Sequence, residues 1–207
     1  MQHIEKKQKT QTNPPDDMIQ FKIVFWGPGE SGKTTNYLHL KEQYKQIQTS
    51  KGFSVETTSG RTLWNDSVFF SFEFDYGRNY QIILQIVTCT GQERFLTTRE
   101  FVVQGADGVI FVADSARDRL DENLRSYQEL VAFARDHRIP ILIQLNKRDL
   151  SDAISVHDFK QYLELPRTTR DALGHQIVYE TIATESIGIY EVFKDMVEKI
   201  LLNHFTK

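Results

Sequence analysis

Residues 27–34 read Gly-Pro-Gly-Glu-Ser-Gly-Lys-Thr, a match to the pattern GxxxxGK(S/T) that decides the fold class of the chain. The stretch follows an apolar run at 21–26. It precedes a segment at 34–47 in which apolar residues recur at helical spacing. A buried strand, a glycine-rich turn and an amphipathic helix are therefore expected in that order. Such a turn binds phosphate because its backbone N–H groups and the positive end of the helix dipole point toward an anion.

The rest of the chain alternates short apolar runs with helix-length segments, which is typical of a mostly parallel sheet covered by helices. Residues 68–74 and 82–86 alternate apolar and polar positions around a polar turn and predict a hairpin. We expect an α/β P-loop NTPase fold with a six-stranded, mostly parallel sheet, one antiparallel edge strand and about five helices. The remaining predicted strands are 109–113, 141–145 and 177–179, and the remaining predicted helices are 120–134, 159–163 and 192–200.

Length and composition indicate one domain. The chain has 207 residues and 40% hydrophobic content, which is enough for a single buried core. Residues 1–18 are polar and contain Pro14 and Pro15, so we expect a flexible tail there and a folded domain over residues 19–207. The net charge of -3 provides no basic surface of the kind that nucleic acid requires, so no nucleic-acid partner is expected.

Composition also bears on location. Cys89 is the single cysteine, so no internal disulfide can form, and the N-terminus lacks the apolar segment of a signal peptide. No stretch approaches the roughly 20 apolar residues of a membrane span. We expect a cytoplasmic protein without a membrane segment of its own.

Residues 146–149, Asn-Lys-Arg-Asp, directly follow the predicted strand at 141–145, where ligands bind in open α/β sheets. A carboxylate at Asp149 can accept both N–H donors of a guanine edge, whereas adenine offers no such pair. We expect Asn146 to tie this loop to the phosphate loop and the stem of Lys147 to cover one face of the base. A charged turn without a ligand is the alternative, and the phosphate loop earlier in the chain argues against it.

Four segments, in this order and spacing, resemble the nucleotide-binding motifs of Ras-type small GTPases. They are the phosphate loop, residues 88–92 (Thr-Cys-Thr-Gly-Gln), residues 146–149 and residues 180–184 (Glu-Thr-Ile-Ala-Thr). The stretches 27–36, 61–63, 111–116 and 146–150 are most similar to the MglA-like prokaryotic GTPases, which act in cell polarity. The resemblance implies a small GTPase domain that binds GTP or GDP with Mg²⁺ and signals as a molecular switch.

The expected nucleotide contacts combine the phosphate loop with these motifs. Lys33 is expected to bridge the β- and γ-phosphates, and the Thr34 hydroxyl to ligate Mg²⁺. By the resemblance, Ala183 and Thr184 would approach the guanine O6 through the backbone. The full predicted set is Gly27, Gly29, Glu30, Ser31, Gly32, Lys33, Thr34, Thr35, Gly91, Asn146, Lys147, Asp149, Ala183 and Thr184.

Hydrolysis of GTP needs an oriented water and positive charge where negative charge develops. Gln92 matches the water-orienting glutamine of the family, and Arg61 matches an arginine that MglA-like proteins supply in cis. Thr57 and Thr62 lie in a loop without periodicity, and either could complete the Mg²⁺ shell. The loops at 57–62 and 92–98 are therefore the expected switches.

Thr88 departs from most Ras-type proteins, which have an aspartate at this position that holds Mg²⁺ through water. We expect a weaker metal site and slow intrinsic hydrolysis, stimulated by a partner. The resemblance implies a Roadblock-type dimer as that partner, with Phe53, Trp64 and Phe95 as candidate contacts.

Two other classes of function are open at this point. A GTP-binding scaffold would hydrolyse almost nothing, because Thr88 replaces the aspartate. An ATP-dependent P-loop kinase or ATPase would instead prefer adenine, contrary to the role expected of Asp149.

Overall fold

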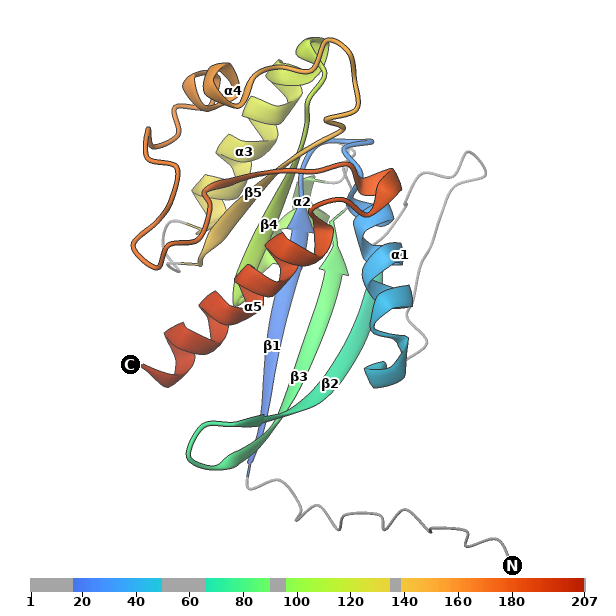
Figure 1. The fold of residues 1–207 in the computed structure, drawn as a ribbon, viewed down its shortest axis with the longest axis vertical. Helices are drawn as coiled ribbons and strands as arrows, with labels where there is room; N and C mark the ends of the chain where they lie inside the picture. The colour runs from blue at the N-terminus through green and yellow to red at the C-terminus, as the bar shows by residue number, and fades with distance from the viewer. Residues whose placement is uncertain (1–16, 50–65, 90–95, 135–138, 207) are drawn as a thin grey trace, which may run out of the picture.

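The structure is a computed structural model, and it describes residues 17–49, 66–89, 96–134 and 139–206. Within those ranges strands and helices alternate along most of the chain (Figure 1). The strands are β1 (Asp17–Trp26), β2 (Ser67–Asp75), β3 (Asn79–Thr88), β4 (Gly108–Asp114), β5 (Ile141–Asn146) and β6 (Val178–Glu180). The α-helices are α1 (Lys33–Gln43), α2 (Leu96–Val103), α3 (Leu120–Ala134), α4 (Val156–Tyr162) and α5 (Ile189–Phe205).

The six strands form one sheet in the order β2-β3-β1-β4-β5-β6. Only β2 runs antiparallel to its neighbour, and it lies at the edge of the sheet. The fold class expected from the sequence is confirmed, including the single antiparallel edge strand. Because β1, β4 and β5 are parallel and adjacent, their carboxyl ends meet at one edge, where ligands bind in such sheets.

Apolar side chains fill two cores, one on each face of the sheet. One core joins α1 and α5 to the sheet, and Figure 1 shows both helices on the near face. The other core joins α2, α3 and α4 to the opposite face. Strand β4 contributes to both cores and is buried along its whole length. A strand that is buried on both faces is continuously apolar, as the run at 109–113 predicts.

Several element boundaries differ from the sequence expectations, and three of these differences concern the tail, the first helix and an expected switch loop. Strand β1 begins at Asp17 and pairs Asp17 and Met18 with β3, so these residues belong to the folded domain and not to the tail. Helix α1 ends at Gln43, and a short 3₁₀ turn at Lys45–Ile47 carries the apolar periodicity onward. Helix α2 begins at Leu96, inside the stretch 92–98 that was expected to be a switch loop. Among the described helices, none combines the length and the apolar composition that a membrane-spanning segment requires.

Candidate nucleotide site

Two glycines of the phosphate loop are required by close packing. A Cβ atom at Gly27 would lie 2.1 Å from the carbonyl oxygen of Val112, and one at Gly32 would lie 2.3 Å from Nδ2 of Asn146. Both residues have positive φ, 152° and 104°, which side chains disfavour. The guanidinium of Arg119 braces the loop by donating a 2.9 Å hydrogen bond to the Gly29 carbonyl oxygen. The phosphate loop is therefore fixed both by close packing against Val112 and Asn146 and by the hydrogen bond from Arg119.

Lys33 lies at the start of α1 with its side chain buried against the loop. Its ammonium group donates to the carbonyl oxygens of Gly27, at 3.1 Å, and Pro28, at 2.5 Å. Burial lowers the pKa of Lys33 to about 8. A phosphate group bound in the loop would favour the charged ammonium form.

The Thr34 hydroxyl, the predicted Mg²⁺ ligand, points toward a buried carboxylate. It donates a 3.1 Å hydrogen bond to Oδ2 of Asp66, and the Thr88 hydroxyl donates to the same oxygen at 2.9 Å. Asp66 directly precedes β2 and was missing from the sequence prediction. The predicted hairpin could have indicated it. In the observed register Ser67 pairs with Val87, so Asp66 lies opposite Thr88.

Asn146 connects the motifs as the sequence predicted. Its Nδ2 donates a 2.8 Å hydrogen bond to the Ser31 carbonyl oxygen in the phosphate loop. Its Oδ1 accepts from the Thr181 hydroxyl at 3.1 Å and from the Ala183 amide at 2.9 Å. Because the Ala183 N–H already has this partner, a base contacted by Ala183 would have to share or displace that bond.

The base loop is anchored by the side chains of the two residues that precede Asp149. The Lys147 ammonium forms a 2.6 Å ion pair with buried Asp114 at the end of β4, which fixes the end of the lysine side chain. Arg148 donates to Glu180 at 2.7 Å and to the Ile154 carbonyl oxygen at 2.6 Å. The side chain of Asp149 is exposed, as a residue that meets a ligand from solvent would be.

The other predicted contacts divide into two groups. Glu30, at positive φ, and Thr184 are exposed, and Thr35 is partly buried. Several predicted residues lie outside the described part of the chain, so their roles remain predictions. These are Arg61, Thr57, Thr62, Gly91 and Gln92, together with the aromatics Phe53, Trp64 and Phe95.

Comparison with known proteins identifies the class to which this geometry belongs. The model of the ADP-ribosylation factor family matches residues 9–200. The chain belongs to this family of small GTPases. A protein of this family is a GTP-binding switch, and the predicted relation to Ras-type small GTPases is confirmed.

Relatives of this small GTPase include both bacterial and animal proteins. It is 32% identical over 196 residues to mutual gliding-motility protein MglA of Myxococcus xanthus, covering 91% of this chain and 94% of that protein. It is 25% identical to ADP-ribosylation factor-like protein 4D of Mus musculus, covering 86% and 82%. It is 24% identical to ADP-ribosylation factor-like protein 4A of Homo sapiens, covering 87% and 84%. The predicted similarity to MglA is thereby confirmed.

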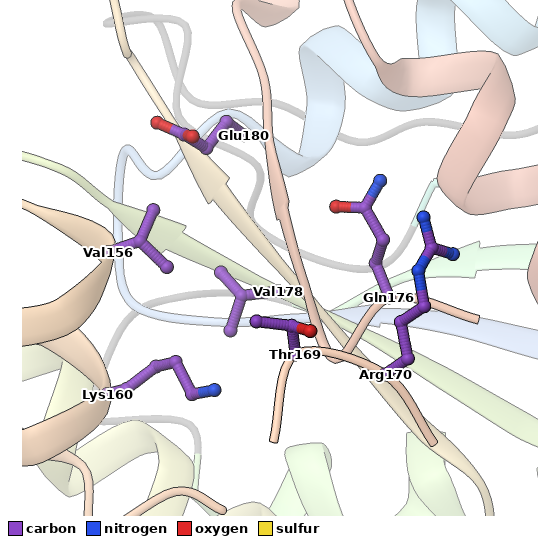
Figure 2. Close-up of a pocket in the computed structure, with 7 residues that line it drawn as sticks. All are labelled: Val156, Lys160, Thr169, Arg170, Gln176, Val178 and Glu180. Atoms are coloured by element: carbon purple, nitrogen blue, oxygen red, sulfur yellow. The ribbon is translucent and has the colours of Figure 1, made fainter. Parts of the chain in front are cut away.

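One hollow of the described structure is lined by no residue of this small GTPase's phosphate loop. It has a volume of about 330 Å³ and opens between α4 and β6. In Figure 2, Val156 and Lys160 extend from α4 toward Val178 of β6. Its lining includes Glu180 but no residue of the phosphate or base loops, so we assign it no part in nucleotide binding.

Proposed function

We propose that this small GTPase binds GTP or GDP together with Mg²⁺ and hydrolyses GTP slowly, as a signalling switch that a partner accelerates. The observation that carries the proposal is the bridge from Asn146 to the Ser31 carbonyl oxygen, which holds the phosphate loop beside the loop of Asp149. One small molecule with phosphates at one end and guanine at the other fits that arrangement.

The chemistry around Thr34 supports Mg²⁺ as the metal. Mg²⁺ prefers oxygen ligands and is usually held by one or two protein oxygens together with substrate phosphates and waters. The Thr34 hydroxyl, the Thr88 hydroxyl and the Asp66 carboxylate offer only oxygen atoms. When bound, the metal would neutralise charge that develops on the phosphates.

The residues of the chain have separable tasks in hydrolysis. Lys33 places positive charge at the phosphates, and Gln92 orients the attacking water. Arg61 adds positive charge in the transition state, and Thr57 or Thr62 joins the metal shell when the γ-phosphate is present. The GTP-bound and GDP-bound forms then differ in the loops at 57–62 and 92–98, which a Roadblock-type partner would recognise. The similarity to MglA supports that choice of partner.

The competing function is a GTP-binding scaffold that signals by occupancy alone. It is motivated by Thr88, which stands where most Ras-type proteins have aspartate. Single-turnover phosphate release from GTP, with Mg²⁺ present, separates the two. We expect slow release from the unmutated protein and about 100-fold slower release from Gln92→Ala. Gln161→Ala, at an exposed position of α4, is the matched control and should release phosphate at the unmutated rate. No release from the unmutated protein would leave only the scaffold.

A further inference from the structure

The buried carboxylate of Asp66 has one satisfied oxygen and one that is not. The residue is 0% exposed. Its Oδ2 accepts hydrogen bonds from the hydroxyls of Thr34 and Thr88, at 3.1 Å and 2.9 Å. Its Oδ1 is also buried, and within the described part of the chain no donor reaches it. Asp66 therefore keeps an acceptor atom available at the start of α1.

Such an arrangement is costly unless a ligand compensates for it. Burying a carboxylate without a cation or a full set of donors costs several kcal/mol. Among the residues that the structure describes, no lysine, arginine or histidine forms an ion pair with Asp66. A bound cation would supply the missing positive charge. The orphaned oxygen thus points to a metal at this place.

The hairpin explains how β2 can supply a carboxylate that β3 lacks. Asp66 and Thr88 face each other across β2 and β3, with the Thr88 amide donating to the Asp66 carbonyl oxygen at 2.9 Å. The Asp66 amide in turn donates to the Thr88 hydroxyl at 3.0 Å. A side chain at either position reaches the same space beside the Thr34 hydroxyl. Asp66 thus brings a carboxylate into direct contact with the side chain at position 88.

We propose that Asp66 is the acidic residue that positions Mg²⁺ in this small GTPase, in the role left open by Thr88. The inference rests on the proposed function, because the metal considered is the one that accompanies the nucleotide. Thr88 then serves to orient the Asp66 carboxylate through the 2.9 Å hydrogen bond. The metal site keeps an acidic oxygen, so the weaker site expected from Thr88 alone does not follow. Asp66 also directly follows residues 50–65 in the sequence, which include the expected switch residues Thr57 and Thr62.

The alternative role for Asp66 is purely structural, as a hydrogen-bond acceptor that joins α1 to the hairpin. Asp66→Asn separates the two roles, because an asparagine amide oxygen can still accept from the hydroxyls of Thr34 and Thr88 but carries no charge. Asp75→Asn is the matched control, since Asp75 lies at the exposed far end of the same strand. Asp66→Asn/Thr88→Asp returns the carboxylate to the position that most Ras-type proteins use.

The test measures the rate at which a fluorescent GDP analogue leaves the full chain as free Mg²⁺ is varied, and again in excess EDTA. For Asp66→Asn we expect at least a tenfold increase in the Mg²⁺ concentration needed to slow release by half, because loss of a group that orients the metal's ligands typically costs about 10- to 100-fold in metal affinity. The rate in EDTA should equal that of the unmutated protein. Asp75→Asn should be unchanged, and the double variant should recover most of the Mg²⁺ response. Mn²⁺ titration followed by electron paramagnetic resonance should give the same ranking.

The outcomes separate the inference from the function on which it rests. If the unmutated protein retains GDP in an Mg²⁺-dependent way and Asp66→Asn does the same at the same concentration, Asp66 has no role at the metal. Equal acceleration of release in EDTA and in Mg²⁺ would assign Asp66 a structural role instead. If the unmutated protein does not retain GDP, or shows no response to Mg²⁺, the proposed function itself fails. Asp66→Ser, which is smaller and also neutral, repeats the test should the asparagine variant not fold.

Discussion

The side-chain amide of Asn146 donates a 2.8 Å hydrogen bond to the main-chain carbonyl oxygen of Ser31, across 115 residues of sequence. Both residues are buried. The amide oxygen of Asn146 accepts from Thr181 and Ala183, so one side chain holds the phosphate loop, the base loop and the segment after β6 together. The positions of the predicted phosphate-binding loop and the predicted base-binding loop therefore depend on the same side chain.

Replacement of Asn146 by alanine should weaken both parts of the site at once. The Ser31 carbonyl oxygen and the Ala183 amide would lose their partner, which costs about 2 kcal/mol in the free energy of unfolding. We expect GDP affinity, measured by fluorescence titration, to fall at least about tenfold, the factor that 1.4 kcal/mol represents. Asn203→Ala, at an exposed position in α5, is the control and should change neither quantity. If Asn146→Ala and Asn203→Ala had the same GDP affinity and stability, the phosphate loop and the base loop would not depend on Asn146 for their positions.

Gly32→Ala should abolish nucleotide binding through a collision. The new methyl group would lie 2.3 Å from Nδ2 of Asn146 and would push that side chain away from Ser31. Gly77→Ala is a matched control, because Gly77 also has positive φ, at 71°, but a methyl group there would meet no atom of the described residues within 4 Å. Gly77→Ala should lose only about 1 kcal/mol of unfolding free energy, the cost of holding an alanine at positive φ. Isothermal titration with GDP and chemical denaturation measure the two effects. Retained GDP binding by Gly32→Ala would contradict the packing described for the loop.

Arg99→Met should destabilise the fold on the face covered by α2. The Arg99 side chain is 2% exposed, forms a 2.8 Å ion pair with Glu129, and lies over the Trp26 ring at 4.3 Å from its centroid. The Glu129 side chain is 28% exposed and stays partly solvated when Arg99 is replaced, so we expect a loss of about 2 kcal/mol in urea denaturation. Arg167→Met, at an exposed position, should stay within about 0.5 kcal/mol of the unmutated protein. A loss for Arg99→Met as small as that of the control would show that the ion pair contributes little.

The elements that were predicted well are those whose signals are local. The phosphate loop is a contiguous motif, and the runs that became β4 and β5 are apolar because both faces of those strands are covered. The role of Asn146 as a connector was also predictable, because the carboxyl ends of neighbouring parallel strands meet at one edge. The structure confirms that role through the bond to Ser31.

The residues that were missed depend on pairing between distant segments. Asp66 gains its position from the register of β2 against β3, and its acidic side chain looks like a turn residue when read alone. Arg99 reads as a solvated charge, yet tertiary packing buries it against Trp26. The start of β1 at Asp17 follows from pairing with Tyr80 of β3, although the residues around Asp17 are polar.

The measurement that bears most directly on the account is a competition assay between GTP and ATP for the purified protein in the presence of Mg²⁺. Exposed Asp149 and the anchored loop around it predict that GTP displaces a bound fluorescent GDP analogue at concentrations at least 100-fold lower than ATP does, a gap of about 2.7 kcal/mol. Asp149→Ala should remove most of that gap, while Asp152→Ala, at an exposed position just beyond the loop, should preserve it. Equal displacement by GTP and ATP from the unmutated protein would contradict the assignment of a guanine-nucleotide switch.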